Sequence, residues 1–419
     1  MSCHITIVGA GIAGLTLALA LHARGIKNLT ILERSASLKE AGSGLNILPL
    51  ATRELAALDL LPELEGKSIL LDRLNYTSPD GEVIWSEPKG RAALFSWPQL
   101  SISRAKFCNV LLKQVRQRLG EDAIIAGAAA SQIKDEHRRL VVFCEDGRDF
   151  KTDMVVGADG IRSQVRRFLF PELDPMRPAP FTVYRGIVRG RKFSDNRTMY
   201  IAGDGICKFV VYPLLIESSA KDIEINWAAA LPDELVPKYP FGKWNVPADA
   251  GDISSRFRGW SLDGLLPDQI IQNTMSIYAY PLVDIEPLKN WSNKSNVVLI
   301  GDAAHGMYPI GSNGATQSII DAVSLAHCLA SFRKRPDAIA AFEADRVSAV
   351  QAIQLANREK GPEVVIDVLA ERRRTSESSF EDLFPHEERL AIAERYAQLT
   401  NVTRAAVNGK SPYMWGRHD

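Results

Sequence analysis

The sequence predicts an α/β fold in which a parallel sheet and its helices are interrupted by a mainly antiparallel sheet. Three times, at 4–35, 149–164 and 296–332, an apolar strand leads into a glycine-containing loop and then into a helix. Such units build parallel sheets. Between 181 and 282 the chain changes to aromatic-rich strand segments separated by loops rich in Pro, Gly and Asp. We therefore expect two sheets, and more than one domain, in the 419 residues.

The first of these units, at 4–35, is a complete βαβ unit. Its loop carries the GxGxxG pattern at Gly9, Gly11 and Gly14. These glycines permit a tight turn, the approach of a pyrophosphate and close packing of the helix on the sheet. Glu33 ends the second strand, where a carboxylate accepts both hydroxyls of an adenosine ribose. The unit predicts a bound dinucleotide, NAD or FAD, with an ordinary strand-turn-helix as the alternative.

Composition limits the classes of partner. The chain has 50 Lys plus Arg and 50 Asp plus Glu, so its formal charge is zero and nothing favours a nucleic-acid partner. Its five cysteines lack CxxC spacing, and we interpret them as reduced, mostly buried thiols. No apolar run approaches the roughly 20 residues that span a bilayer, and the first apolar segment lacks a basic leader. We expect a cytoplasmic monomer or homodimer with no membrane partner.

A loop at 42–46 contains two candidate residues, Gly44 and Leu45. Closely spaced glycines indicate a loop that is mobile or near a ligand. A surface turn before a helix at 52–58 is the alternative. A hairpin is expected at 70–85, with its turn at Pro79-Asp80-Gly81.

Arg104 lies near the start of a long amphipathic helix within 101–119. A cation gains nothing from the helix dipole at that end. We therefore expect the Arg104 side chain to have a role outside the helix; the alternative is an arginine that is simply solvated.

Strands are expected at 140–143 and 149–156, followed by a helix that begins near Gln164. The second strand delivers Asp159 and Gly160 to a loop at its end. Such a loop faces a ligand beyond the carboxyl edge of a sheet.

The inserted region contains the strand segments FTVYRGIV, KFVVYPLL, IEINWAAAL and MSIYAYPLV, and a short helix and turn at 254–265. Polar tips on alternating strands can face a cavity, although about half of such residues are structural. The residues concerned are Tyr184, Arg185, Tyr212, Asn226 and Trp227.

The third unit leads from the strand at 296–300 into GDAAHGMYPIGSNG and a helix expected from Ala315 to Phe332. It delivers Asp302 to a loop, as the second unit delivers Asp159. The backbone N–H groups of Gly311 to Gly314 lie at a helix start, which suits a negative charge that develops on a ring. Another helix is expected at 338–359. The charged segment 364–408 is interpreted as a solvated cap or dimer surface, and the tail beyond Gly409 as disordered.

Together these motifs resemble the group A flavin-dependent aromatic hydroxylases, which share the para-hydroxybenzoate hydroxylase fold. The matching stretches are GAGIAG with Glu33, GADGIRS, GDAAHGMYPIGSNGATQSIID and Arg104. Within this group the chain is most similar to the phenazine hydroxylases of pyocyanin synthesis, the 5-methylphenazine-1-carboxylate monooxygenases, through VIWSEPKG, YPLVDIEPLKNW and LANREK. The resemblance implies a discontinuous Rossmann-like FAD-binding domain at 1–180 and 283–360, a substrate domain with a mainly antiparallel sheet at 181–282, and a C-terminal helical cap and tail at 361–419.

The resemblance also implies FAD as the cofactor and NADH or NADPH as a transient co-substrate without its own domain. Glu33 would hold the adenosine ribose, Arg104 the phosphate or ribityl region and Asp302 a ribityl hydroxyl. The loop 311–314 would face N1 and O2 of the flavin and orient the ring, chiefly through Gly311, Asn313 and Gly314. The implied cofactor residues are Gly9, Gly11, Ala13, Gly14, Glu33, Arg34, Gly44, Leu45, Arg104, Asp159, Gly160, Asp302, Gly311, Ser312, Asn313 and Gly314.

The implied reaction is hydroxylation of an aromatic or heteroaromatic ring by NAD(P)H and O₂ through a flavin C4a-hydroperoxide. The protein then supplies orientation, a dry pocket and charge stabilisation, which agrees with the lack of a Ser-His-Asp or metal motif. His305 belongs to a structural turn in this family, with a catalytic base as the alternative. The substrate is expected to be a planar aromatic acid, with loss of CO₂ as one option. The expected substrate residues are Tyr184, Arg185 as an anion handle, Tyr212, Asn226, Tyr308 and Pro309.

Two other functions remain open. One is a flavin epoxidase or ring-modifying oxygenase of a non-carboxylated natural product, which uses the same cofactor chemistry. The other is a non-catalytic flavin or NAD sensor whose charged C-terminal segment binds a partner. The intact set of flavin motifs favours an enzyme over a sensor.

Overall fold

The computed structural model describes residues 3–37, 43–136, 139–173, 175–215, 222–237, 239, 243–376 and 378–413; Gly42 of the expected glycine loop lies outside these ranges. Its first sheet has five parallel strands in the order β19-β12-β1-β2-β8, with the first strand of the chain in the middle. This is the order of a doubly wound sheet. The strands are β1 (Ile5–Val8), β2 (Leu29–Glu33), β8 (Ile124–Ala126), β12 (Met154–Gly157) and β19 (Val297–Leu299).

Three helices pack together beside this sheet: α1 (Ile12–Ala23), α4 (Arg104–Leu119) and α8 (Asn313–Ser331). The predicted βαβ unit at the amino terminus is confirmed. Helix α8 begins at Asn313 rather than at the expected Ala315, because Ser312 takes a left-handed backbone conformation and the helix starts directly after it. Asn313 and Gly314 are therefore in the first turn of the helix.

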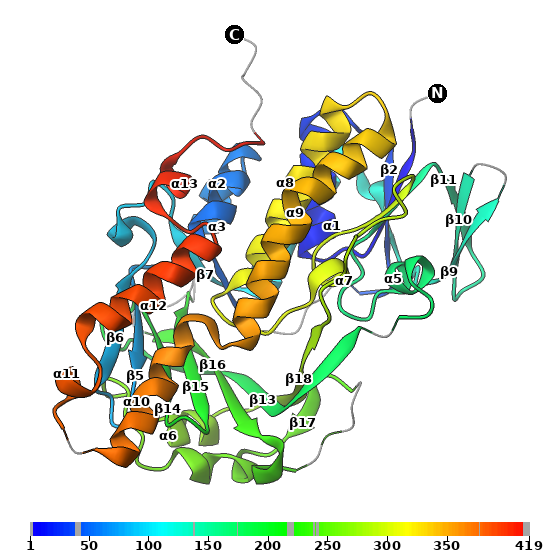
Figure 1. Ribbon diagram of the computed structural model, residues 1–419. Coiled ribbons are helices and arrows are strands. Elements are labelled where there is room, and N and C mark those ends of the chain that lie inside the picture. Colours follow the sequence, from blue (N-terminus) through cyan, green and yellow to red (C-terminus); the bar gives the residue numbers. More distant parts are fainter. Residues whose placement is uncertain are drawn as a thin grey trace.

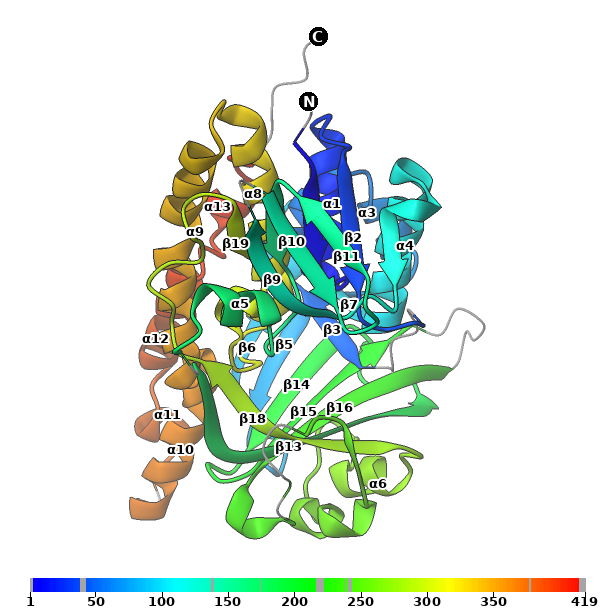
Figure 2. The ribbon, with the colours of Figure 1, turned by 90° about the vertical axis from the view of Figure 1, so that its right-hand side faces the viewer.

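The second sheet has eight strands in the order β17-β18-β13-β16-β15-β14-β5-β6, and it lies below the parallel sheet in Figure 2. The strands are β5 (Arg73–Thr77), β6 (Val83–Pro88), β13 (Met176–Arg191), β14 (Thr198–Gly203), β15 (Lys208–Leu214), β16 (Asp222–Pro232), β17 (Val246–Ala248) and β18 (Ile277–Ile285). The predicted hairpin forms as β5 and β6, but it joins this sheet through a parallel pairing of β5 with β14.

The expected limits of the inserted region, 181 and 282, therefore do not coincide with the ends of the sheet. β13 begins at Met176 and β18 continues to Ile285, while β5 and β6 come from the segment before the insertion. Strand β14 was not expected, although its six residues are all buried. A short apolar strand between polar loops gives only a weak sequence signal, and its partner β5 is distant in the chain.

Two small sheets complete the architecture, β3-β7-β4 and β11-β10-β9. Their strands are β3 (Gly44–Ile47), β4 (Ile69–Leu71), β7 (Gln99–Ser103), β9 (Ala130–Glu136), β10 (Arg139–Cys144) and β11 (Asp149–Thr152). The single strand expected over 149–156 is wrong, because the chain changes sheets at Asp153, between β11 and β12. The Asp153 carboxylate accepts a hydrogen bond from the His4 backbone N–H (2.8 Å), which fixes this bend beside β1.

The remaining helices lie mainly in the second half of the chain. Figure 1 shows α8 and α9 side by side, α10 to α12 along the edge of the molecule next to β5 and β6, and α13 beside α2. The α-helices are α2 (Pro49–Ala57), α3 (Leu61–Glu65), α5 (Gln164–Leu169), α6 (Pro267–Gln272), α7 (Asp302–His305), α9 (Arg335–Arg358), α10 (Val364–Thr375), α11 (Phe380–Leu383), α12 (His386–Leu399) and α13 (Arg404–Asn408). The short 3-10 helices are η1 (Gly90–Ala93), η2 (Glu121–Ala123), η3 (Asp233–Leu235), η4 (Ala250–Asp252), η5 (Ser254–Phe257) and η6 (Gly361–Glu363).

The C-terminal segment is more than a solvated surface. Helix α10 packs on β5, β6 and β14, and its Val365, Ile366 and Leu369 are buried in the core of the large sheet. The tail expected to be disordered beyond Gly409 is packed up to Tyr413, whose hydroxyl donates to Asp345 Oδ2 (2.9 Å). The tail packs because Tyr413 brings a buried ring and a bonded hydroxyl with it.

Two expectations from composition can be compared with the structure. All five cysteines are thiols that form no disulfide bond, and four of them are buried. Within the described ranges no helix combines the length and the apolar character that crossing a membrane requires.

Candidate active site

The three predicted loops meet at one edge of the parallel sheet. Strand β1 pairs Val8 with Gly157 of β12, and Gly157 in turn pairs with Leu299 of β19. Each strand continues at this edge into its loop, at Gly9, Ala158 and Ile300. Because these are carboxyl ends of parallel strands near the first strand, the loops surround the crevice where doubly wound sheets bind ligands.

The glycines of the first loop have three different environments. A Cβ on Gly9, which has φ +107°, would lie 2.4 Å from the carbonyl oxygen of Ala158. A Cβ on Gly14 would lie 2.0 Å from the carbonyl oxygen of Gly9, so Gly14 allows α1 to pack closely on its strand. A Cβ on Gly11 would meet no described atom within 4 Å. Gly11 is therefore not required by the protein's own packing, and the space beside it suits a ligand.

Glu33 is held at the end of β2 beside this loop. One carboxylate oxygen accepts from the N–H of Ala10 (2.8 Å) and the other from the N–H of Ser35 (2.8 Å). Each oxygen keeps a second lone pair, which suits the hydroxyls of a ribose. Arg34 beside it is exposed, and burial together with the charge of Arg34 lowers the pKa of the Arg162 guanidinium in the next loop.

The Asp159 carboxylate forms hydrogen bonds within the protein that fix its own loop. It accepts hydrogen bonds from the Ser163 hydroxyl (2.5 Å) and from the N–H groups of Gln164 (2.7 Å) and Val165 (3.3 Å). Burial raises the pKa of this carboxyl, and these bonds partly offset the shift. Asp159 thus fixes the loop before α5, while the neighbouring Gly160 has φ +76° and open space beside its Cα.

Asp302 differs from Asp159 because it is exposed. It begins α7 directly after Gly301, and within the described ranges its carboxylate has no hydrogen-bond partner. Gly301 has φ +60°, and a Cβ there would lie 3.0 Å from the Cβ of Ala13. The first turn of α1 and the Asp302 loop therefore touch, which leaves the Asp302 carboxylate available to a ligand on the same edge.

The loop 311–314 joins this edge to α8. Gly311 has φ +62° and Ser312 has φ +58°, both in the left-handed region. Asn313 is buried, and its Nδ2 donates to the carbonyl of Gly311 (3.2 Å). Gly314 has no described neighbour within 4 Å of a Cβ, so the start of α8 is open to a ligand.

A buried polar network that sequence analysis missed lies behind these loops. Asp321 of α8 accepts from Gly301 N–H (2.9 Å), from Arg346 Nε (2.9 Å) and pairs with His305 Nε2 (2.5 Å). Burial raises the pKa of the Asp321 carboxyl, but the His305 and Arg346 charges outweigh burial and hold this pKa below its ordinary value. An acidic residue in the apolar run SIIDAV was the available signal.

The network continues into the loop 311–314. Arg346 Nη2 donates to Gln317 Oε1 (2.6 Å), and Gln317 Nε2 donates to Asn313 Oδ1 (3.1 Å). His305 is completely buried and faces the Trp291 ring, with centroids 5.1 Å apart. This environment supports the interpretation of His305 as structural rather than as a base that meets a substrate.

Gly44 brings the large sheet to the same region. Its N–H donates to Asn226 Oδ1 (2.6 Å), and a Cβ at this position would lie 2.5 Å from the Tyr212 ring. Only glycine fits here without displacing that ring. Next to it, the N–H of Arg104 donates to the Ser43 carbonyl (2.8 Å), so the start of α4 is fixed to the same loop.

Arg185 lies on the same face of the large sheet as Tyr212 and Asn226. Its guanidinium lies over the Tyr280 ring at 5.1 Å and donates to Asn245 Oδ1 (2.6 Å). Burial raises the pKa of Tyr212 and of Tyr280, and the Arg185 charge partly offsets both shifts. The charge of Arg185 therefore acts on both phenol groups, and its guanidinium lies over the ring of Tyr280.

The expectation that Tyr184 lines the same pocket is wrong. Consecutive residues of a strand point to opposite faces. Tyr184 lies on the far face with Trp227, whose indole N–H donates to the Thr274 hydroxyl (2.9 Å), and its ring meets Tyr239. Tyr184 and Trp227 belong to the core beneath the sheet.

Tyr308 and Pro309 lie in the loop between α7 and α8. Burial raises the pKa of the Tyr308 hydroxyl, and the negative charge of Asp284 raises it further. Pro309 is exposed. No hydrogen bond within the described ranges joins Tyr308 to Arg185, Tyr212 or Asn226. The structure thus brings three of the expected substrate residues together and leaves Tyr308 and Pro309 in the loop between α7 and α8.

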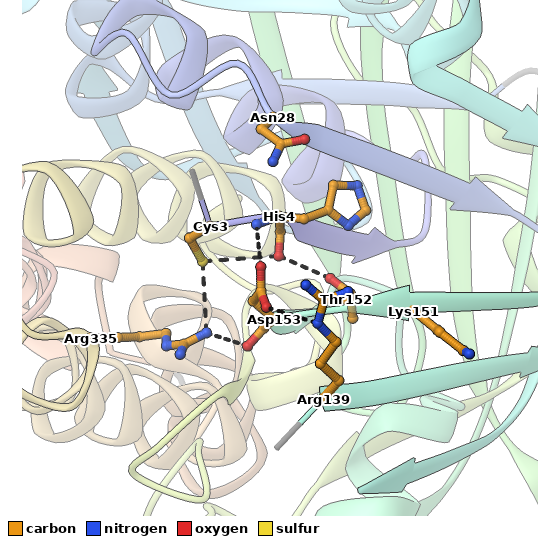
Figure 3. Close-up of a pocket in the computed structure, with 8 residues that line it drawn as sticks. All are labelled: Cys3, His4, Asn28, Arg139, Lys151, Thr152, Asp153 and Arg335. Carbon is orange, nitrogen blue, oxygen red and sulfur yellow. Dashed lines mark hydrogen bonds and ion pairs between the residues drawn. The ribbon is translucent and has the colours of Figure 1, made fainter. Parts of the chain in front are cut away.

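A hollow of about 690 Å³ lies at the opposite, amino-terminal ends of the parallel strands (Figure 3). It is lined by Cys3, His4, Asn28, Arg139, Lys151, Thr152, Asp153 and Arg335. Arg335 donates to the Asp153 carbonyl, and Arg139 faces the Asp153 carboxylate at 3.8 Å. Two of its three cations are therefore engaged at the bend between β11 and β12, away from the glycine loops. Among the described residues no His, Cys, Asp or Glu group could hold a metal ion.

The residues at the carboxyl edge fit a bound dinucleotide. Gly11 leaves room for a pyrophosphate, a helix start faces it, Glu33 presents fixed lone pairs, and the Asp302 carboxylate has no hydrogen-bond partner among the described residues. The FAD binding domain family model matches residues 288–356, which include β19, α7, α8 and most of α9.

Curated relatives match most of the chain. Phenazine 1,6-dicarboxylic acid hydroxylase PhzS of Lysobacter antibioticus is 34% identical over 368 residues, which cover 85% of this chain and 89% of that protein. Aurachin C monooxygenase/isomerase of Stigmatella aurantiaca is 33% identical over 354 residues, covering 82% and 85%.

The solved structures agree in fold. Klebsiella pneumoniae HpxO complexed with FAD and uric acid superposes with a TM-score of 0.73 at 21% identity, covering 96% of this chain and 97% of that chain. The fold is that of para-hydroxybenzoate hydroxylase, and the sequence identity to the first relative shows the family. The chain belongs to the FAD-dependent aromatic monooxygenases, close to the enzymes that hydroxylate phenazines.

Proposed function

We propose that this monooxygenase hydroxylates a planar heteroaromatic carboxylate of the phenazine type. The observation that carries the proposal is the position of Arg185 over the Tyr280 ring, on the face that presents Tyr212 beside Gly44. Tyr280 also stacks on Trp244, with centroids 6.1 Å apart and planes 27° apart. Flat aromatic walls with one cation suit a flat anionic ring system.

The relatives support the same class of substrate. The first relative is named for a phenazine dicarboxylic acid, and others are named for hydroxybenzoates. Within the described residues Arg185 lies over the Tyr280 ring and forms no ion pair with a carboxylate, so a ligand carboxylate gains a charge-assisted hydrogen bond there. A carboxyl-bearing ring carbon held near the flavin makes hydroxylation with loss of CO₂ the second option.

The proposed cofactor contacts follow from the edge of the parallel sheet. Glu33 holds the adenosine ribose, the open side of Gly11 faces the pyrophosphate, and Asp302 holds a ribityl hydroxyl. The N–H groups of the loop 311–314 face the electron-rich side of the ring. The parallel-sheet region thus binds FAD, and the large sheet, including β5 and β6, binds the substrate.

When bound, FAD takes electrons from NAD(P)H and activates O₂ for transfer to the substrate ring. The residues of the chain bind the cofactor and the substrate and orient the two rings. The loop 311–314 and the start of α8 stabilise negative charge on the reduced ring. Tyr212, Trp244 and Tyr280 exclude water from the reacting ring, and Arg185 fixes its direction.

Product analysis tests this function. The purified protein with FAD and NADH or NADPH in air is expected to convert a phenazine carboxylate into a product with one added oxygen, or with a hydroxyl in place of the carboxyl. Mass spectrometry with ¹⁸O₂ identifies the source of the oxygen. If ¹⁸O enters only the product of a ring compound that has no carboxylate, and phenazine carboxylates are not converted, the result would instead support the ring-modifying oxygenase.

Arg185→Ala is expected to raise the KM for the carboxylated substrate about tenfold to a hundredfold, because it removes a charged hydrogen bond worth ~1.5–3 kcal/mol. FAD affinity should not change, since Arg185 lies on the substrate sheet. Steady-state kinetics and flavin fluorescence titration measure the two quantities.

Arg189→Ala is the matched control, because Arg189 lies on the same strand and forms an exposed ion pair with Asp222 (3.2 Å). It should leave the KM unchanged. An unaltered KM in Arg185→Ala would remove Arg185 as the carboxylate handle.

A further inference from the structure

The C-terminal helix α12 reaches the loop 311–314 through one residue, Tyr396. A Cβ on Gly311 would lie 2.2 Å from Tyr396 Oη, and a Cβ on Gly361 would lie 2.8 Å from its Cε2. The ring therefore fills the space beside both glycines. Helix α12 also packs against α9 and η6, which fixes the position of Tyr396 beside the loop.

The hydroxyl of Tyr396 connects the loop to α9. It accepts from Asn313 Nδ2 (3.0 Å) and donates to Asn357 Oδ1 (2.7 Å). Burial raises the pKa of this phenol, so it stays protonated and keeps its donor. Both hydrogen-bonding functions of the hydroxyl are in use.

Asn357 extends this connection to the other end of the loop. It is completely buried in α9, and its Nδ2 lies 3.3 Å from the carbonyl of Tyr308 and 3.3 Å from that of Ile310. The segment 308–313 is therefore held at its start by Asn357 and at its end by Asn313, and Tyr396 bonds to both. We refer to Tyr396, Asn313 and Asn357 as the loop clamp.

We propose that Tyr396 is a positioning residue that holds the loop 311–314 against the flavin ring, so that the C-terminal helix controls the reduction of the flavin. The inference rests on the proposed placement of this loop beside the ring. Donors aimed at a developing charge are effective only when they are held in place beforehand. Loss of the hydroxyl removes the hydrogen-bond donor of the buried Asn357 Oδ1 and one of the two acceptors of Asn313 Nδ2, which favours rearrangement of the loop.

Tyr396→Phe tests this role, because it keeps the ring between the two glycines and removes only the hydroxyl. Amide hydrogen exchange of 308–314 in the FAD-bound protein is expected to become faster. FAD affinity should fall about tenfold, as expected from two lost hydrogen bonds. The flavin midpoint potential should move to a lower value, because the reduced, anionic ring loses stabilisation.

Tyr413→Phe is the matched control. Tyr413 is another buried C-terminal tyrosine, and its hydroxyl donates to Asp345 (2.9 Å), outside the loop clamp. This variant should leave loop exchange, FAD affinity and potential at wild-type values. Equal effects of the two variants on the flavin would assign Tyr396 a general structural role and overturn the proposal.

Asn357→Leu, alone and combined with Tyr396→Phe, supplies a second test of the loop clamp. It fills a similar space and removes both donors to the loop carbonyls. If Tyr396 acts through Asn357, the double variant should show the same potential and FAD affinity as the more affected single variant. Fully additive shifts would contradict the clamp.

These outcomes separate the inference from the proposed function. If Asp302→Ala and substitutions in the loop 311–314 leave the FAD affinity at the wild-type value, the proposed placement of the cofactor is contradicted. If those substitutions weaken FAD binding, but Tyr396→Phe leaves the flavin potential and the loop exchange unchanged, only the role of Tyr396 is contradicted.

Discussion

Gly11→Ala is expected to fold as well as the wild-type chain and to bind FAD about tenfold to a hundredfold more weakly. The flavin-free protein has no described atom within 4 Å of the added Cβ, and Gly11 has φ −81°, which alanine adopts without strain. A pyrophosphate that approaches this backbone would meet the methyl group, and such overlap costs ~1–3 kcal/mol. Flavin fluorescence titration measures the affinity, and thermal unfolding of the flavin-free protein measures the stability.

The neighbouring glycines provide the contrast. Gly14→Ala places a methyl group 2.0 Å from the Gly9 carbonyl, so it should destabilise the flavin-free chain itself. Gly251→Ala, whose nearest neighbour is the Asp249 carboxylate at 3.5 Å, should change neither quantity. If Gly11→Ala binds FAD as tightly as the wild type, the pyrophosphate does not lie at this loop.

Asp321→Asn is expected to destabilise the flavin-free protein by about 3–5 kcal/mol, the usual cost of breaking a buried ion pair. Asparagine keeps the shape but leaves the Arg346 guanidinium buried without a negative partner, and the bond to Gly301 weakens. A shift of the denaturant midpoint measures the change, and weaker FAD binding should accompany it because Gly301 precedes Asp302.

The pH dependence of stability follows from the lowered pKa of Asp321. Since the carboxyl has a lower pKa folded than unfolded, its contribution is present above the ordinary aspartate range and is lost as the pH falls through the folded-state value. Asp321→Asn should lack this acid-dependent component.

The control for this variant is Asp345→Asn on α9. Asp345 is exposed and accepts from the Ser324 hydroxyl (2.6 Å) and the Tyr413 hydroxyl (2.9 Å). The same chemical change at an exposed site should cost about 1 kcal/mol or less. Equal losses in the two variants would contradict a special role for the Asp321 network.

The sequence predicts the parts of the fold that depend on local patterns. The GAGIAG unit, the Asp159 loop and the strand before Asp302 are each set by strand apolarity, glycine and a following helix, and the structure contains all three. The residues expected around the cofactor accordingly lie at one edge of one sheet. Their roles toward FAD stay predictions that the variants above test.

The pairing of strands that are distant in the chain could not be predicted from the sequence. Nothing local indicates that β5 pairs in parallel with β14, because the two strands are more than a hundred residues apart. The bend at Asp153 depends on a hydrogen bond from His4, which lies 149 residues earlier in the chain. Tyr396 in a charged helix gives no sign that it contacts Gly311, since only the folded chain brings the two together.

The substrate face shows a different limit. Tyr184 and Arg185 were both expected to line the pocket, although the two-residue period of a strand permits only one of them. Choosing between them required knowing which face packs in the core with Trp227 and which faces Gly44. The pairing of Tyr212 with Asn226, and the contact of both with Gly44, supplied that knowledge.

The most direct measurement is anaerobic reduction of the bound flavin by NADH or NADPH, followed by loss of flavin absorbance, with and without a panel of aromatic and heteroaromatic acids. We predict that phenazine-type carboxylates accelerate the reduction strongly, and that Arg185→Ala needs about tenfold to a hundredfold more of the carboxylate for the same acceleration while the flavin stays bound. A flavin whose reduction no aromatic acid accelerates would contradict a substrate-dependent hydroxylase of heteroaromatic acids.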